Sequence, residues 1–501
     1  MAKALRRLLL LAVSGLAVVL LGEAVYRATL HLGAPATGTA AHQFELYGVG
    51  ESTMVGEPFE PKISVPRLLE HLFGHALAGR TIVVRNLAER GVPLYPQSIA
   101  FEQAVAFRDP SVPGVALIMS GHNEGFTPAT PDGRRASALT EMSEGSALVR
   151  DAVLALRRHR AIGREKSLAM YEHYLRRVIE TAQRKGLVPI LTTMASNIAR
   201  IEPNYEGSDG YAVGAVVEHG MRLEAEGRYR EARDLYVSNI AGHANASASL
   251  YYRAGHCEEA LGDFAAARED YWTAVDLDPR TSFGRATRPQ NDLLRRLARE
   301  YRIPLVDAVE IFEARSPHGL LGNELFMDGQ HPSIEGYRLL ADAYARILTD
   351  RFNQPIANPL RDEREVAAAV GFGPEDVSGS LVDAGSWLIA TSVNHPFPRD
   401  RMALAAKHFA TLVGRGDDFS AWMGIALTQA ALRGGMLRSP ADLLTLGNWG
   451  GYTKSYRNVP STNLPPLLVT FQKCGVDADV IDRLRALAPG TPAAAMPQPG
   501  G

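Results

Sequence analysis

The chain has 501 residues, of which 46% are hydrophobic and 22% charged, and its formal net charge is −2. This composition is typical of a globular protein long enough for two or three domains, and without a net basic charge it argues against nucleic acid as a partner. Only two cysteines occur, Cys257 and Cys474, too few for a disulfide framework or a cysteine zinc site, although a single bridge between them is the less favoured alternative.

The N-terminus has the pattern of an export signal. Residues 1–7 hold three basic residues, Lys3, Arg6 and Arg7, and an apolar run follows at 8–22. Basic residues before such a run keep the N-terminus in the cytoplasm and send the following chain across the membrane. The apolar pattern extends to residue 32 if Glu23 and Arg27 lie at an interface, and a spanning helix needs about 20 residues. We therefore expect an uncleaved transmembrane anchor rather than a cleaved signal peptide.

Beyond a linker at 34–43, strand and helix patterns alternate. Apolar or β-branched runs predict strands at 44–50, 81–88, 114–121 and 187–194, and a strand that leads into a helix at 303–312. Amphipathic spacing predicts helices at 64–77, 98–107, 164–186, 291–301 and 334–352. The continuous β-branched run at 81–88 suits a strand that is buried on both faces. The alternation predicts a parallel sheet covered on both sides, built from 44–204 and 283–354.

The segment 205–282 interrupts this alternation and contains a repeat. Four positions match at an offset of 35 residues, namely Gly227 with Gly262, Tyr229 with Phe264, Ala232 with Ala267, and Tyr236 with Tyr271. This pattern resembles a pair of tetratricopeptide (TPR) units, whose period is about 34 residues. Two units bury less surface than a long array, so we expect them to lean on the α/β domain or on the C-terminal helices. A protein partner that binds these repeats is an open alternative.

The C-terminal part of the chain carries no chemical motif. Residues 355–488 are apolar enough to fold and have a helical pattern, which predicts a helical C-terminal domain. The tail at 489–501 is rich in Pro, Ala and Gly and is predicted to be disordered.

Four segments of the sequence carry residues that could meet at one edge of the predicted sheet. Ser52 follows the first strand, Gly91 the second and Asn123 the third, while Asp328 and His331 stand three apart near the end of the α/β region. In an open parallel sheet, ligands bind beyond the carboxyl ends of the strands. A lone serine after a glycine at such a position is more often a turn or cap residue. The four segments together make a catalytic serine the better reading.

This ordered set resembles the SGNH, or GDSL-type, hydrolase family. The resemblance spans roughly residues 44 to 350 without the insert, and it is closest to the membrane-anchored bacterial members that carry TPR units. It implies a three-layer α/β/α fold with a flavodoxin-like parallel sheet. It also implies a bacterial inner-membrane location, with the catalytic domain in the periplasm. One departure is Glu51, which stands where the family has an aspartate before its serine.

The resemblance assigns a role to each of the five residues. Ser52 would be the nucleophile, His331 its general base, and Asp328 the carboxylate that orients the imidazole. The oxyanion hole would combine the backbone N–H groups of Ser52 and Gly91 with the Asn123 side-chain amide. A histidine can take and return the serine proton near neutral pH, and a carboxylate stabilises the imidazolium that forms.

The predicted reaction is the cleavage of an acyl or O-acetyl ester through an acyl-serine intermediate, with no cofactor and no metal. An acylated glycan and an acyl lipid are both open as substrates, in the periplasm or at the cell envelope. Two alternatives remain: an O-acyltransferase on the same fold, and an inert TPR scaffold of an envelope complex. In the acyltransferase, another hydroxyl group instead of water would take the acyl group from the serine. The scaffold would not need Ser52, Asp328 and His331.

Other polar residues have ordinary structural readings. His71 and His75 have metal-compatible spacing, but no third ligand is apparent, so a surface role is favoured. His122 either lines the site or shapes its loop, and Glu124 is expected to support loop backbone. For Arg285 we favour a cap or an ion pair over contact with an anionic substrate.

Overall fold

The computed structural model describes residues 42–124, 164–204, 210–242, 247–279, 283–392, 395–434, 455–456 and 464–487. The predicted anchor at 1–33 and the predicted tail at 489–501 lie outside these ranges. Among the described residues, no helix combines the length and the apolar character that crossing a membrane requires. Cys257 and Cys474 are both free thiols.

A six-stranded sheet forms the centre of the first domain. Its strands are β1 (Gln43–Gly50), β2 (Ala76–Leu77), β3 (Arg80–Asn86), β4 (Gly114–Met119), β5 (Val188–Thr192) and β6 (Leu305–Val306). They lie in the order β2-β3-β1-β4-β5-β6, and all neighbours are parallel except β2 and β3. The five parallel strands have the flavodoxin-like order, so the predicted α/β class and sheet type are confirmed.

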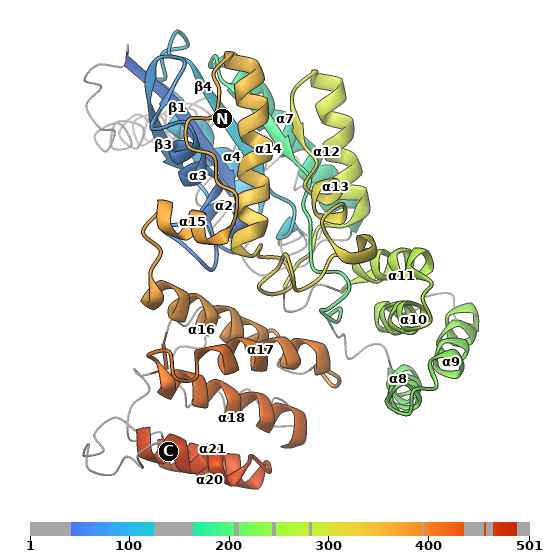
Figure 1. Ribbon diagram of the computed structural model, residues 1–501. Helices are drawn as coiled ribbons and strands as arrows, with labels where there is room; N and C mark the ends of the chain where they lie inside the picture. The colour runs from blue at the N-terminus through green and yellow to red at the C-terminus, as the bar shows by residue number, and fades with distance from the viewer. Residues whose placement is uncertain are drawn as a thin grey trace, which may run out of the picture.

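Helices cover both faces of this sheet (Figure 1). On one face lie α3 (Val65–Leu72) and α14 (Ile334–Phe352), and on the other α4 (Leu94–Ala104), α7 (Arg164–Arg184) and α12 (Arg288–Tyr301). The Ser333 hydroxyl caps α14 by accepting the Gly336 N–H at 3.2 Å. With helices on both sides, β4 is buried along its whole length, and the largest hydrophobic core forms around it.

Two local predictions differ from the structure. The helix predicted at 64–77 ends at Leu72, because Gly74 and His75 take left-handed φ values of 59° and 63° and turn the chain back. The residues that follow form β2, which is antiparallel to β3. The strand β3, predicted to be buried on both faces, buries only Ile82, and it lies second from the edge of the sheet.

The insert folds as two helical hairpins of similar construction. Its helices are α8 (Gly210–Ala225), α9 (Tyr229–Gly242), α10 (Ala248–Ala260) and α11 (Phe264–Leu277). The matched residues Ala232 and Ala267 are fully buried, as are Tyr236 and Tyr271. The matched glycines take left-handed φ values in the turns between helices. The 35-residue repeat of the sequence therefore corresponds to equivalent positions in the two hairpins.

The insert leans on the rest of the chain, as its small size requires. The Trp272 indole N–H donates to Glu313 at 3.2 Å, where Glu313 ends α13 (Ala308–Glu313). The Tyr252 hydroxyl donates to Asp400 at 2.8 Å in the C-terminal helices. Figure 1 shows the four helices to one side, below the sheet domain.

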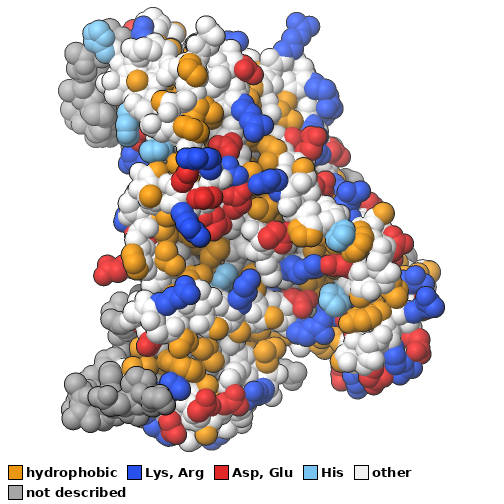
Figure 2. Space-filling view, viewed as in Figure 1, with side chains coloured by type: hydrophobic (Ala, Val, Ile, Leu, Met, Phe, Trp, Pro, Cys, Tyr) orange, Lys and Arg blue, Asp and Glu red, His pale blue; other side chains and the backbone are white. Residues whose placement is uncertain are grey.

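The C-terminal helices form a second core. They are α15 (Glu363–Ala369), α16 (Pro374–Ala390), α17 (Arg399–Leu412), α18 (Asp418–Gly434), α20 (Leu464–Lys473) and α21 (Ala478–Leu487). Of these helices, α15 packs into the first core through Val366, and the others build the second core. Figure 2 shows Lys and Arg side chains interspersed with Asp and Glu on the visible face, with hydrophobic side chains gathered over these helices.

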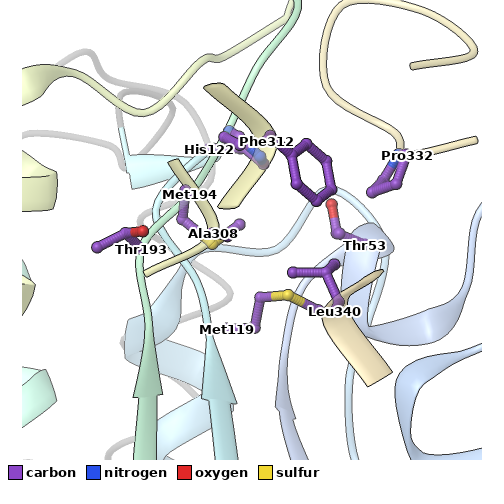
Figure 3. Close-up of a pocket in the computed structure, with 10 residues that line it drawn as sticks. Thr53, Met119, His122, Thr193, Met194, Ala308, Phe312, Pro332 and Leu340 are labelled. Atoms are coloured by element: carbon purple, nitrogen blue, oxygen red, sulfur yellow. The ribbon is translucent and has the colours of Figure 1, made fainter. Parts of the chain in front are cut away.

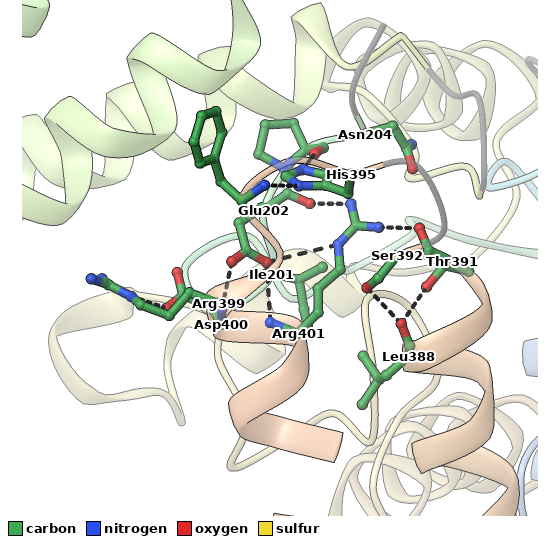
Figure 4. A network of polar contacts seen from close by, with 12 residues as sticks. Ile201, Glu202, Asn204, Leu388, Thr391, Ser392, His395, Arg399, Asp400 and Arg401 are labelled. Atoms are coloured by element: carbon green, nitrogen blue, oxygen red, sulfur yellow. Dashed lines mark hydrogen bonds and ion pairs between the residues drawn. The ribbon is translucent and has the colours of Figure 1, made fainter. Parts of the chain in front are cut away.

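A buried network of charges joins the second core to the sheet domain (Figure 4). The Glu202 carboxylate, beyond β5, accepts the N–H groups of Asp400 at 2.5 Å and Arg401 at 3.1 Å and so caps the start of α17. The fully buried Arg401 guanidinium donates to the carbonyls of Glu202 and Thr391, both at 2.6 Å. Burial lowers the pKa of Arg401 to about 10, which leaves it charged at neutral pH.

Replacing Arg401 by Met should destabilise the protein strongly, because Glu202 would lose its buried cationic neighbour. Breaking a buried ion pair from one side costs about 3–5 kcal/mol, which a urea titration would measure as a lower unfolding midpoint. The control is Arg433→Met, since Arg433 pairs with Asp477 in the solvent and should matter little. An Arg401→Met midpoint equal to that of the control would contradict the prediction.

Candidate active site

The candidate site lies where the strand order of the sheet reverses. Ser52 follows β1 and Asn123 follows β4, and these two strands are neighbours at the switch point. Open α/β sheets bind ligands in the crevice at this point. The strands approach closely at their carboxyl ends, where a Cβ on Gly50 would come within 2.1 Å of the Met119 carbonyl oxygen. Only glycine fits there, and the close approach brings the two following loops together.

Ser52, His331 and Asp328 form one hydrogen-bonded relay. Ser52 begins the short helix α2 (Ser52–Val55) and is 1% exposed. The His331 Nδ1–H donates to Asp328 Oδ2 at 2.6 Å, which leaves Nε2 free to accept the Ser52 hydroxyl at 2.8 Å. Residues 279 positions apart in the sequence thus take the arrangement of a nucleophile, a base and an orienting carboxylate.

The backbone of its own loop holds the Asp328 carboxylate. Asp328 Oδ1 accepts the N–H groups of Gln330 and His331, both at 2.9 Å. The Met327 N–H donates to the His331 carbonyl at 2.9 Å and closes the loop. Burial alone would raise the pKa of the Asp328 carboxyl, but the neighbouring His331 and the two N–H donors hold it below its ordinary value. Asp328 is therefore the anionic partner of the imidazole.

Glu51, the residue that departs from the family pattern, organises the opposite side of the site. Its buried carboxylate accepts the Ser120 hydroxyl at 2.8 Å and three backbone N–H groups. These belong to Gly121 at 2.9 Å, His122 at 3.1 Å and Asn123 at 3.2 Å. Burial raises the pKa of the Glu51 carboxyl to about 7, and the four donated hydrogen bonds oppose this shift. The longer side chain thus fixes the whole loop after β4.

The same loop is held from the other direction. The Gln290 amide donates to the Gly121 carbonyl at 3.1 Å, and the Ala286 N–H donates to His122 Nδ1 at 3.1 Å. The Tyr171 hydroxyl donates to the carbonyl of Ser120. These contacts leave the backbone around Asn123 with little freedom to move.

Two of the groups predicted to donate hydrogen bonds in an oxyanion hole, those of Asn123 and Gly91, differ in how deeply they are buried. The Asn123 side chain is 5% exposed, and its amide nitrogen has no hydrogen-bond partner in the described part of the chain. Burying an unpaired donor costs about 1–3 kcal/mol, so such a group is expected to serve a ligand. Gly91 lies in an exposed loop with φ of 68°. That loop is tied to the end of β1 by the Glu89 N–H, which donates to the Gly50 carbonyl at 3.1 Å.

A small pocket adjoins the relay (Figure 3). It is lined by residues next to Ser52 and His331 and by apolar side chains from the ends of β4 and β5, α13 and α14, namely Thr53, Met119, His122, Thr193, Met194, Ala195, Ala308, Phe312, Pro332 and Leu340. The Thr53 hydroxyl is buried and has no partner among the described residues. The pocket is mostly apolar, and its polar lining includes Thr53 and His122.

Four further predictions can be compared with the structure. His122 lines the pocket, and its Nδ1 also accepts a hydrogen bond that helps to hold its loop. Both of the roles considered for it therefore agree with the structure. Glu124 accepts the Leu94 N–H at 2.8 Å, which agrees with a structural role. Arg285 is fully buried and donates to Asp278 at 2.8 Å, which agrees with the ion pair. His75 is exposed and lies 3.4 Å from Glu70.

The sequence reading missed Asn197, which belongs to the site. The Asn197 amide donates to the Asp328 carbonyl at 3.2 Å, and its backbone N–H donates to the Gly329 carbonyl at 3.1 Å. Asn197 lies just beyond the carboxyl end of β5, so the rule that identified Ser52 and Asn123 applied to it as well.

The described residues contain one group of three carboxylates with metal-compatible spacing. Glu57, Glu60 and Asp383 have ligand atoms within 4.8 Å of one another. Arg90 pairs with both glutamates, at 2.5 Å from Glu60, so its guanidinium already supplies a positive charge to these two carboxylates.

In comparisons with known proteins, this chain is similar only to solved structures. No protein-family model and no curated protein matches the chain. A lipolytic protein of the G-D-S-L family from Veillonella parvula is 14% identical, with a TM-score of 0.30, and covers 61% of this chain and 98% of its own. A GDSL-like lipase from Bacteroides thetaiotaomicron is 11% identical, with a TM-score of 0.31, over 65% and 97%. Similarities this low assign no function, and the fold rests on the strand order of this chain.

The buried Glu51 should make stability depend on pH. Between pH 4.5 and about 7 the folded chain holds a proton on Glu51 that the unfolded chain has released. The free energy of unfolding should therefore fall as the pH rises through this window, by up to about 3 kcal/mol. The measurement is the difference in unfolding free energy between wild type and Glu51→Gln at pH 5 and at pH 8.

The control for this measurement is Glu89→Gln, which changes an exposed glutamate in the neighbouring loop. Its difference from the wild type should stay constant with pH. If the Glu51→Gln difference were equally constant, the raised pKa of Glu51 would be wrong.

Proposed function

We propose that this protein is a serine hydrolase that cleaves an ester bond through an acyl-serine intermediate on Ser52. The relay of Ser52, His331 and Asp328, with distances of 2.8 and 2.6 Å, is the observation that carries the proposal. All three residues are 1% exposed. Desolvated polar side chains are costly, and a scaffold that only binds a partner has no use for this arrangement.

Acylation begins when the Ser52 Oγ attacks the ester carbonyl carbon. His331 Nε2 accepts the hydroxyl proton as the new C–O bond forms, and Asp328 stabilises the resulting imidazolium. The negative charge on the tetrahedral oxygen is met by the Asn123 amide and the Ser52 backbone N–H, with Gly91 as the third expected donor. When the tetrahedral intermediate collapses, the imidazolium gives its proton to the departing alkoxide and the alcohol leaves.

Deacylation runs the same steps with a new nucleophile. His331 removes a proton from a water molecule, whose oxygen attacks the acyl carbon, and the proton then passes to Ser52 as the acid is released. If another hydroxyl group took the place of water, the product would be a new ester and the protein would be an acyltransferase. Free acid released per ester consumed therefore separates the two reactions.

Removing the Ser52 hydroxyl should abolish turnover. We expect Ser52→Ala to lower kcat on a short-chain aryl ester by at least about 1,000-fold and to prevent labelling by a serine-directed phosphonate. Ser111→Ala, which removes an exposed hydroxyl, is the control and should keep both properties. A folded wild type that neither hydrolyses the ester nor takes up the phosphonate would refute the hydrolase.

The Asn123 amide should act on the transition state rather than on the substrate. Asn123→Asp keeps the shape of the side chain but replaces the donor with a carboxylate that repels the oxyanion. We expect kcat to fall by about 100- to 1,000-fold, with KM changed by much less. Steady-state kinetics with the same ester measure both constants. An effect confined to KM would show that Asn123 binds the substrate and has no part in an oxyanion hole.

A further inference from the structure

Helix α17 reaches from the second core to the loop that carries Asp328. Arg401 and His408 lie seven residues apart, two turns along one face of this helix. Arg401 joins the network around Glu202, while His408 Nε2 lies 2.7 Å from the carbonyl oxygen of Met327. Met327 directly precedes Asp328, and the His408 side chain is buried. One helix of the C-terminal part therefore contacts the catalytic loop directly.

A second contact presses on the same loop. A Cβ on Gly329 would come within 2.8 Å of the Phe283 ring, so the ring packs directly against the loop. Phe283 belongs to the second core, and the guanidinium groups of Arg285 and Arg401 lie 5.5 and 4.8 Å from its ring centre. Residues of the second core and of α17 thus support the loop backbone at Met327 and Gly329, the two positions that flank Asp328.

We propose that His408 is a positioning residue that holds the Asp328–His331 pair in register with Ser52. The inference rests on the proposed function and extends it, because it makes the C-terminal helices part of the catalytic apparatus. The His408 Nε2–H donates to the Met327 carbonyl. The backbone N–H of Met327 donates in turn to the His331 carbonyl at 2.9 Å and closes the loop. The peptide units around Met327 are therefore held on both sides.

The charge state of His408 is consistent with this donor role. Burial lowers the pKa of His408, despite the opposing influence of the Met327 carbonyl and Asp328. The imidazole is therefore neutral at physiological pH, with its proton on Nε2, and it adds no positive charge beside the Asp328 carboxylate. Lys407 is the other charged group that acts on His408, and it is exposed.

Catalysis is sensitive to the position of this loop. Asp328 acts only if its carboxylate meets His331 Nδ1 and His331 Nε2 meets Ser52 at the same time. A misplacement of about 1 Å by a change far from the reacting atoms can cost about 100-fold in rate. Losing the His408 hydrogen bond should thus lower kcat while leaving substrate binding nearly unchanged.

A matched pair of variants separates positioning from packing. His408→Gln places an amide N–H donor where Nε2 lies, whereas His408→Leu has a similar volume and no donor. We expect His408→Leu to lower kcat by about 10- to 100-fold with KM nearly unchanged, and His408→Gln to restore most of the loss. Lys407→Gln, an exposed change on the same helix, is the control and should match the wild type.

A proton spectrum adds a readout that simple loss of packing would not move. The short hydrogen bond between His331 Nδ1 and Asp328 should give a low-field resonance in the wild type and in His408→Gln, and a weakened or shifted one in His408→Leu. Thermal unfolding shows whether each variant is folded. If His408→Leu is not, His408→Met, with a flexible side chain that fills the same space, takes its place.

The outcomes separate the inference from the function on which it rests. Equal kcat and equal spectra for His408→Leu and His408→Gln would overturn the positioning role, even if both took up the phosphonate at Ser52. Equal loss in both folded variants would reduce His408 to a packing residue. A folded wild type that does not react with the phosphonate would overturn the proposed function and this inference together.

Discussion

The candidate site depends on one buried acceptor, the Glu51 carboxylate. It lies between the end of β1 and the loop after β4, and it receives four hydrogen bonds from residues 120–123. Because the donors are mostly backbone groups, this interaction fixes the path of the chain and not only one side chain. The direction in which the Asn123 amide points follows from that path. Glu51, which stands before Ser52, is therefore a structural part of this candidate site.

The two halves of the relay come from distant parts of the chain that the fold of the sheet domain brings together. Ser52 is placed by β1, whereas Asp328 and His331 sit in a loop just before α14, which packs on the same sheet. That loop makes its own internal hydrogen bonds and is also held by Asn197 beyond β5. In the proposed hydrolase, these contacts would hold the three side chains in their reactive orientation before a substrate binds, and electrostatic catalysis depends on such preorganisation.

Buried charges connect the helical parts of the chain to this apparatus. Glu202 caps α17 across the boundary between the two cores, and Arg401 satisfies carbonyls on both sides of it. Each charge would be costly alone, and together they specify one docking geometry. The same helix then delivers His408 to the backbone beside Asp328. The C-terminal helices, which carry no motif, thus contact the candidate site through the His408 hydrogen bond.

The sequence by itself determined the alternation of strands and helices, the 35-residue repeat of the insert, and the candidates Ser52, Asn123, Asp328 and His331. These features are local, since hydrophobic periodicity and the position of a residue after a strand are written in neighbouring residues. Only the tertiary structure decided which groups meet. The role of Glu51, the support from His408 and the end of α3 at Leu72 depend on contacts between distant segments and on left-handed turns, which periodicity does not encode.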